Sequence, residues 1–592
     1  MGILKNRLGI LLFLVSLVIS LFVFKDYGVT WDEQISHLVG ETSYNYLVKH
    51  DNSLYSFDDR FYGVGFELPL IVIEKALSLH DARSVSLMRH LVTHIFFLFS
   101  AFILFILIDY LYHNKFLAAA GFLMLVLNPV LYAHSFFNSK DIPFMAMFTI
   151  CFLLTAVAFK KGRLKYFALL GIACGLLLNI RLMGILLIML ITLRFGIDFI
   201  LSGNNKKENI NRALGLLTFL AASTLTLYIT WPYLWVNPFQ NFISAYKTMA
   251  NFPWQGQVLF LGERIKASEL PWYYSVAWFL ISNPILYLCY GAFGLLLLIF
   301  GFIRRPFLFI SNKINRNHLM YFLCFAGPIL VIIILRSTLY DSWRQLFFIY
   351  TSFILLAVYG LNYLLKTRLK VIIPILTFIG FGSIAYFMIS NHPFQQVYFN
   401  RFVPRESPEY LRKNFELDYW GSSYKADLEY ILATDTSNRI TFFVANYPGY
   451  SNRYMLKQND RKRLEYVNNE KWLEATYFIT NYRYHPEDYE ELKPYRYHSF
   501  KVFNSTIIDI FKSDQIYEKA NLSYDAVYHN LPPDKKDTTG REEYIRKVES
   551  QIRNDSSWYE AIRQKAKAWN KPIDTVIHND AIWLWDKKQK EK

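Results

Sequence analysis

Residues 8–33 read LGILLFLVSLVISLFVFKDYGVTWDE, an uncharged apolar run followed closely by two adjacent acids. The apolar run, residues 8–24, is long enough to cross about 30 Å of hydrocarbon as a helix. Lys5 and Arg7 precede it, as they would in a signal peptide, but no small-residue cleavage site follows Phe24 and many similar runs come later. We therefore interpret residues 8–24 as a first membrane span.

Further apolar runs of similar length follow over the first two thirds of the chain. They lie near residues 91–112, 116–135, 143–159, 166–180, 182–201, 213–235, 275–303, 319–336, 345–365 and 371–389. The 592 residues are 53% hydrophobic and 18% aromatic, which is not the composition of a soluble globular protein. We expect a polytopic α-helical membrane protein with about 11 spans, in which the long run 275–303 tilts or begins as an interfacial helix.

The net charge of +16 belongs to the apolar part of the chain. From residue 391 onward there are 32 basic and 30 acidic residues, which leaves 31 basic and 17 acidic residues in the first 390. A nucleic-acid binder would be expected to show a basic stripe on a soluble domain, whereas this surplus lies between apolar runs, where membrane topology is set. Nucleic acid is therefore not an expected partner.

The loop charges predict an orientation. With the N-terminus in the cytoplasm, the inner segments hold 17 Lys and Arg and one acid, while the outer loops hold 13 basic and 14 acidic residues. The positive-inside rule favours this arrangement. It predicts a multi-pass protein of the plasma (inner) membrane, with an outer loop 25–90 that carries interfacial helices and with everything after Ile389 outside the cell.

Two domains are predicted: a transmembrane domain, residues 1–390, and an extracytoplasmic soluble α/β domain, residues 391–592. In the second, apolar β-rich runs alternate with charged segments of helical character. The β-rich runs are Arg439–Ala445, Ala475–Thr480 and Phe500–Phe511, and Arg541–Lys565 is a helical segment.

The acid pair after the first span is the first candidate site. Asp32 and Glu33 stand in the segment VTWDEQISH, on the expected outer side. Adjacent acids at a membrane exit are costly unless they are used, and one of them can serve as a general base whose pKa is adjusted by partial burial and nearby cations. The alternative is a helix start, with Thr30 or Asp32 as the cap and acids in the first turn. Both interpretations can hold together.

Other charged residues fall on the same expected face. Asp141 lies in the short outer turn NSKDIP, where helix capping is the simpler alternative. Arg181 follows the small-residue helix GIACGLLLNI with hardly any loop to solvate it, so it needs an anionic partner or must reach the interface. Arg344, in YDSWRQ, is as compatible with a local pair to Asp341 as with a ligand role.

Two acids and several arginines at the outer mouth of a helical bundle suit sugar transfer from a lipid phosphate. A phosphate leaving group needs charge neutralisation, which arginine supplies in bidentate fashion. One base for the acceptor hydroxyl is then enough, whereas a glycosidase needs a paired acid and base. A lipid tail on the donor also explains why such a site lies in a membrane.

These residues resemble a known family over roughly residues 1–390: the polytopic GT-C glycosyltransferases, specifically the glycosyltransferase family 39 group with protein O-mannosyltransferases and the bacterial aminoarabinose transferase. The family's Asp-Glu pair is matched by Asp32 and Glu33, its acid in the next outer loop by Asp141, and its small-residue helix ending in a cation by Arg181. The resemblance implies a polyprenyl-phosphate sugar donor, a base in the acid pair and cations on the donor phosphate. Four segments look like a bacterial branch: LPWYY (270–274), YDSWR (340–344), HPFQQVYFN (392–400) and ELDYWG (416–421).

We therefore expect an inverting glycosyltransferase that moves a single sugar from a polyprenyl-phosphate donor to a glycan, lipid or protein acceptor on the extracytoplasmic side. Asp32 is the expected general base, Glu33 orients it or the acceptor, and Asp141 positions the acceptor or supports the base. No cofactor is expected to be required. Asp32 and Asp141 together could hold a divalent cation, but no His/Cys cluster demands a metal.

Arg181 and Arg344 are expected to bind the donor phosphate, with Arg264 as a third candidate. The rival hypothesis is a transporter or flippase for a lipid-linked or anionic substrate, which would spread ionisable residues through the depth of the bundle. Arg194 and Asp198, toward the inner end of a span, are such residues, but their i,i+4 spacing predicts a mutual pair. A membrane-anchored binding protein is a third possibility, although eleven spans exceed what anchorage needs.

Overall fold

A computed structural model describes residues 6–203, 205–250, 254, 256–405, 407–467, 475–513, 541–568 and 573–590. The chain divides into two compact units, Met1–Leu522 and Ser523–Lys592. The first unit holds the helical bundle and a mixed β-sheet, and the second holds three helices. The predicted boundary near residue 390 stays a prediction.

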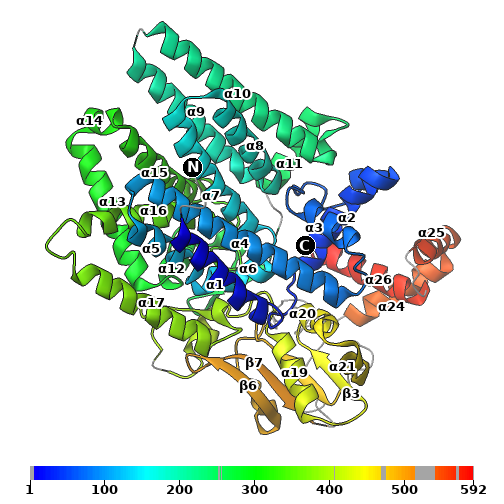
Figure 1. The fold of residues 1–592 in the computed structure, drawn as a ribbon. Helices are drawn as coiled ribbons and strands as arrows, with labels where there is room; N and C mark the ends of the chain where they lie inside the picture. Colours follow the sequence, from blue (N-terminus) through cyan, green and yellow to red (C-terminus); the bar gives the residue numbers. More distant parts are fainter. Residues whose placement is uncertain are drawn as a thin grey trace. The chain divides into compact units, whose positions relative to one another are not determined.

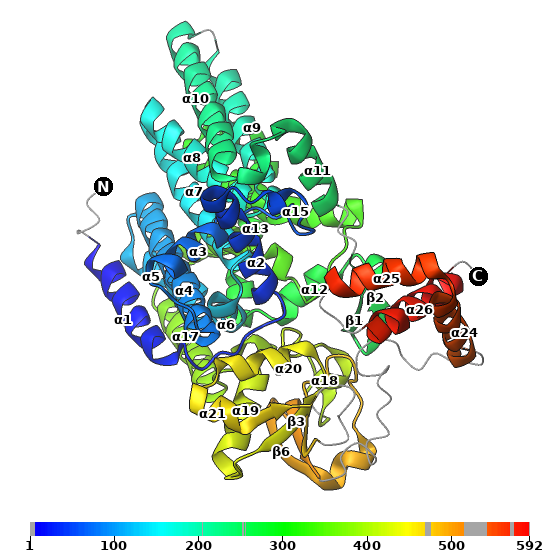
Figure 2. The same ribbon diagram turned by 90° about the vertical axis from the view of Figure 1, so that its right-hand side faces the viewer.

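The described part of the chain contains seven helical segments long and apolar enough to cross a membrane: α4 (Ala82–Tyr112), α7 (Asp141–Lys161), Leu182–Ser202 including α9 (Ile185–Ser202), α10 (Lys206–Thr230), α13 (Ile285–Arg304), α15 (Lys313–Leu335) and α17 (Ile372–Ser390). A bent pair, α5 (Lys115–Val126) and α6 (Pro129–Phe137), and three shorter apolar helices, α1 (Arg7–Val23), α8 (Leu164–Ile180) and α16 (Ile349–Leu364), correspond to the remaining runs. The predicted polytopic helical fold is confirmed. In both views α8, α9 and α10 run side by side (Figures 1 and 2).

Two of the predicted spans are broken. The run 116–135 bends by 62° between α5 and α6, where Asn128 caps α6 and Pro129 occupies its first turn. The run 275–303 breaks between α12 (Tyr274–Ile281) and α13, next to Asn283. The Asn128 Nδ2 donates to Asn283 Oδ1 at 2.6 Å, so the two breaks lie against each other in the buried interior. Because these breaks fall within apolar sequence, hydropathy alone does not reveal them.

The segment between α1 and α4 folds into short helices. It contains α2 (Glu33–Lys49), a 3₁₀ turn (Asn52–Tyr55) and α3 (Glu67–Ala76) before α4 begins at Ala82. Gly40 of α2 lies so close to α3 that a Cβ on it would approach the Glu67 carbonyl oxygen to 2.9 Å. This close packing fixes the two helices beside the end of the bundle that carries the candidate residues.

The later part of the first unit is α/β, which confirms that prediction. Its five-stranded sheet has the order β4-β3-β5-β7-β6, with β3 parallel to β4 and β5, and β7 antiparallel to β5 and β6. The strands are β3 (Ile440–Val444), β4 (Leu464–Tyr466), β5 (Tyr477–Thr480), β6 (Arg496–Val502) and β7 (Ser505–Lys512).

Short helices accompany the sheet: α18 (Tyr410–Asn414), α19 (Tyr424–Thr434), α20 (Tyr447–Asn452) and α21 (Gln458–Arg463). Tyr424, Leu428 and Ile431 of α19 pack on buried strand residues, including Phe442 and Val444 of β3. The run Phe500–Phe511, predicted as one β segment, contains a hairpin instead. Phe503 and Asn504 both have positive φ, 52° and 60°, as a two-residue hairpin turn requires.

The second unit has three helices, α24 (Arg541–Asn554), α25 (Ser556–Ala568) and α26 (Ile573–Lys590). They bury a small apolar core that includes Ile552, Ile562 and Ile577. The helical character predicted for Arg541–Lys565 is confirmed, as two helices rather than one.

Candidate active site

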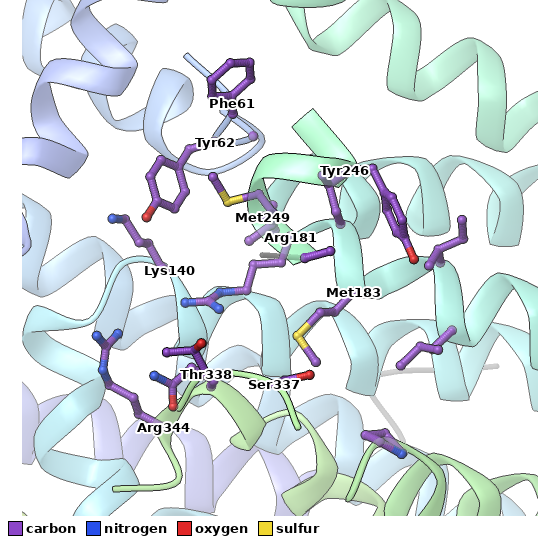
Figure 3. Close-up of a pocket in the computed structure, with 18 of the residues that line it drawn as sticks. Phe61, Tyr62, Lys140, Arg181, Met183, Tyr246, Met249, Ser337, Thr338 and Arg344 are labelled. Atoms are coloured by element: carbon purple, nitrogen blue, oxygen red, sulfur yellow. The ribbon is translucent and has the colours of Figure 1, made fainter. Parts of the chain in front are cut away.

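A cavity of about 280 Å³ lies where the loop before α2 meets the ends of α7, α8 and α15. One end of it is polar, with Asp32, Lys140, Arg181 and Arg344 among its lining residues. The opposite wall is apolar and includes Met183, Leu186, Val331 and Leu335. Figure 3 shows Lys140, Arg181 and Arg344 gathered on one side and Met183 and Tyr246 on the other. The cavity is therefore amphipathic.

Asp32 and Glu33 lie at the start of α2, and Asp32 also lines the cavity. Glu33 is buried, and its Oε1 accepts hydrogen bonds from the backbone N and the hydroxyl of Thr30, at 2.9 and 3.1 Å. This is the backbone contact of a capping box. The other oxygen, Oε2, lies 2.9 Å from His90 Nε2. Glu33 is thus held in the protein interior, while the neighbouring Asp32 side chain lines the cavity and is 36% exposed.

Arg344 joins acids from three separate segments. Its Nη1 lies 3.6 Å from Asp32 Oδ2 and 3.5 Å from Asp141 Oδ2, and its Nη2 donates to Asp341 Oδ2 at 3.1 Å. The guanidinium also stacks near the ring of Trp420, 5.0 Å from its centroid. Arg344 is 2% exposed, so these contacts form in a weakly solvated setting. The local pair with Asp341 and the contacts to the other acids exist together.

Asp141 is buried between two arginines. Its Oδ1 lies 2.5 Å from Arg181 Nη2, its Oδ2 faces Arg344, and Asn138 Nδ2 donates to Oδ2 at 2.9 Å. Its backbone N donates to Asn138 Oδ1 at 2.8 Å at the start of α7. The side chain that caps this turn is therefore that of Asn138 and not that of Asp141. The structure thus brings Asp32, Arg181 and Arg344 to one cavity, while the buried Asp141 contacts both arginines without lining it.

Arg181 is placed by the end of α8. Asn179, the second residue before it, accepts from Val64 N at 3.0 Å and donates to Thr230 O at 3.0 Å. Gly63 passes so close that a Cβ there would fall 1.7 Å from the Asn179 carbonyl oxygen, which leaves space only for glycine. These contacts hold the segment between the 3₁₀ turn and α3 against the end of α8, where Arg181, which is 20% exposed, pairs with Asp141.

Cations set the ionisation of Asp32. Burial alone would raise the pKa of its carboxyl, but Lys140, Arg344, Arg181 and Arg483 outweigh burial and lower it below the usual range. Asp32 is therefore ionised at neutral pH and can accept a proton. The partly exposed position of its side chain keeps it within reach of a molecule in the cavity.

Two cations near Asp32 carry no distinctive sequence signal. Lys140 lines the cavity, with its Nζ 4.3 Å from the centroid of the Tyr62 ring. Arg483 comes from the α/β part, directly after β5, and contacts Asp341. Arg264, the third expected phosphate ligand, is not among the described lining residues: its guanidinium donates to the backbone carbonyl of Tyr484. The structure does not bring Arg264 into the cavity.

Among the described residues, no group of three or more His, Cys, Asp and Glu side chains is arranged to hold a metal ion. Arg194 and Asp198 form the expected pair, with Nε to Oδ1 at 3.1 Å, and Arg316 Nε lies at 3.1 Å from the same oxygen.

No family model and no curated protein matches the chain. Among solved structures, it is similar to the oligosaccharyltransferase of Archaeoglobus fulgidus in the apo form, at 11% identity over 82% of this chain and 71% of that one, with a TM-score of 0.46. It is similar to ArnT from Cupriavidus metallidurans bound to undecaprenyl phosphate, at 11% identity over 86% and 98% of the two chains, with a TM-score of 0.42. At these values the likeness is distant.

Proposed function

We propose that this chain is a membrane glycosyltransferase that moves one sugar from a polyprenyl-phosphate donor to an acceptor. The observation that supports this most strongly is the single cavity in which a partly exposed, ionised Asp32 stands beside two guanidinium groups and an apolar wall. The polar end offers what a phosphate leaving group and an acceptor hydroxyl need, and the wall offers what a lipid chain needs.

The donor phosphate would bind at the polar end. Arg181 and Arg344 each direct a guanidinium toward Asp141, and Lys140 adds a third cation at the cavity surface. Guanidinium groups pair with phosphate in bidentate geometry and neutralise the charge that develops on a leaving phosphate. A phosphate would therefore share these cations with Asp141.

The lipid chain of the donor would follow the apolar wall. Val331 and Leu335 of α15 are 38% and 68% exposed, so this wall continues onto a face of α15 that is open to its surroundings. In a bilayer that face would meet acyl chains. A polyprenyl chain could then remain in lipid while its phosphate occupies the cavity.

The chemical step would be a single displacement with inversion. The acceptor hydroxyl oxygen forms a bond to the anomeric carbon, the bond from that carbon to the phosphate oxygen breaks, and the hydroxyl proton passes to Asp32. Polyprenyl phosphate leaves with the bonding electrons, held by Arg181 and Arg344. Asp141 is enclosed between the two arginines and supports the base by fixing them. Glu33 fixes the turn that carries Asp32.

The proposal keeps the predicted topology, with the N-terminus in the cytoplasm and both the reaction and the α/β part on the extracytoplasmic side of the plasma membrane. A glycan, a lipid or a protein that presents a hydroxyl group could be the acceptor. The Arg194 and Asp198 charges near the inner end of α9 pair with each other and with Arg316, so they do not require a transport path.

Binding of undecaprenyl phosphate to the purified protein in nanodiscs tests the proposal. We expect R181Q and R344Q each to weaken binding at least tenfold. R344K should have an intermediate affinity, because lysine keeps the charge but cannot form the bidentate hydrogen bonds of a guanidinium. R336Q is the matched control, since Arg336 is an exposed residue beyond the end of α15 that does not line this cavity. Equal affinity in wild type, R181Q and R344Q would refute the assignment of the phosphate site.

A further inference from the structure

Arg483 extends from the α/β part of the first unit into the candidate site. Arg483 follows β5, is buried, and donates from Nη2 to Asp341 Oδ1 at 2.8 Å. Asp341 is itself 4% exposed, and its other oxygen, Oδ2, accepts from Arg344 at 3.1 Å. The Asp341 carboxylate is thus shared, with one oxygen on each guanidinium.

The local backbone is shaped for this arrangement. Asp341 and Ser342 both have positive φ, 57° and 64°, a conformation that costs most non-glycine residues energy. It directs the Asp341 carboxylate back toward Arg344, three residues later. Arg483 is also bonded to the carbonyl of Tyr419 and lies 5.6 Å from the centroid of the Trp31 ring, beside the loop that carries Asp32.

Charge explains why the shared carboxylate matters. Within the described contacts, Arg344 faces three carboxylates, those of Asp32, Asp141 and Asp341. Arg181 compensates Asp141, and Arg483 compensates Asp341. Without Arg483, Asp341 would depend on Arg344 alone, and Arg344 would have less positive charge to offer an incoming anion.

We propose that Arg483 is a positioning residue of the site, which neutralises Asp341 and so leaves Arg344 oriented and available for an anionic phosphate. This inference rests on the proposed function in naming the anion, but the contact itself does not. It makes the α/β part a component of the phosphate site. The same contact fixes the turn at residues 340–344 against the loop that follows β5.

A double-mutant cycle on binding of undecaprenyl phosphate in nanodiscs tests the proposal with the full chain. We expect R483Q to raise the dissociation constant at least fivefold in the wild-type background but less than twofold in the D341N background, because its effect passes through Asp341. R412Q is the matched control. The Arg412 side chain, 2% exposed against 6% for Arg483, also lies in the α/β part, but it pairs with Glu409 and Asp488. We expect R412Q to leave the affinity within twofold of wild type.

A second double-mutant cycle, on thermal stability, tests the contact of Arg483 with Asp341 in the absence of lipid. R483Q and R344Q together should lower the thermal unfolding temperature by more than the sum of the single changes, because only the double variant leaves Asp341 buried without a cation. If R483Q does not fold, R483M, which removes the charge but keeps a long side chain, replaces it in both cycles.

The two cycles separate the possible failures. Equal effects of R483Q in both backgrounds, or no effect on affinity, would overturn the role of Arg483 even if undecaprenyl phosphate binds. Thermal coupling in a protein that does not bind undecaprenyl phosphate would instead overturn the proposed function and keep the contact through Asp341.

Discussion

Replacing Asp32 with Asn should separate binding from transfer. The side chain keeps its shape, and its carboxylate is 36% exposed with Arg344 at 3.6 Å, so little stability depends on it. We expect the unfolding free energy to change by less than about 1 kcal/mol. Removing a negative charge that lies 3.6 Å from Arg344, the proposed phosphate ligand, removes a repulsion of about 1 kcal/mol, so undecaprenyl phosphate should bind as tightly or several-fold more tightly.

The rate of sugar transfer should fall in the same variant. Loss of a general base typically lowers the rate by about 10²-fold or more, so D32N should release polyprenyl phosphate from a radiolabelled polyprenyl-phosphate sugar at most about 1% as fast as wild type. Isolated membranes that carry equal amounts of each protein provide the assay, and the nanodisc measurement provides the affinity. Near-normal release by D32N, or weaker lipid binding with transfer retained, would remove Asp32 from the role of base.

Three further changes test the surroundings of the site. N452A should destabilise the protein by about 2–3 kcal/mol and slow sugar transfer, because the Asn452 side chain bonds to Val29 N and O at 2.9 and 2.8 Å, just before Asp32. A melting temperature lowered by less than about 1 °C would contradict this. L186W should fill space along the apolar wall of the cavity and weaken undecaprenyl phosphate binding at least fivefold. L193W, at an exposed position of α9 outside the cavity, should leave the affinity unchanged. Burial raises the pKa of Glu416 to about 8 from 4.5, so this carboxyl should contribute a loss of stability as pH rises from about 5 to 8. The melting temperature of wild type should therefore fall relative to that of E416Q over this range, and a constant difference would refute this.

The sequence predicts the spans well because apolar composition over about 20 residues is a local property. Hydropathy does not predict the breaks at Asn128 and Asn283, because the residues around each remain apolar, and the hydrogen bond that joins the two breaks links segments far apart in the sequence. The hairpin at Phe503 and Asn504 is missed because the turn lacks glycine and proline, so the end of β6 and the start of β7 look like one continuous run.

The candidate site shows the same limit. Asp32, Asp141, Arg181 and Arg344 could be selected because charge at a membrane exit is unusual enough to need a reason. Arg483 could not, because an arginine in a polar α/β segment is ordinary. Arg264 is the weaker candidate in the sequence, and in the structure its guanidinium donates to a backbone carbonyl away from the cavity. Which cations meet depends on contacts between distant segments, and a single sequence does not record those contacts.

The contact between Arg483 and Asp341 also limits how the chain can be divided or recombined. A truncated form that ends near residue 390 would retain every span and every charged residue of the bundle, yet Asp341 would lose its second cation. A chimera with a foreign soluble portion would lose it too, unless the replacement presents a guanidinium at the same place. The α/β part therefore cannot be removed or exchanged without changing the contacts of Asp341.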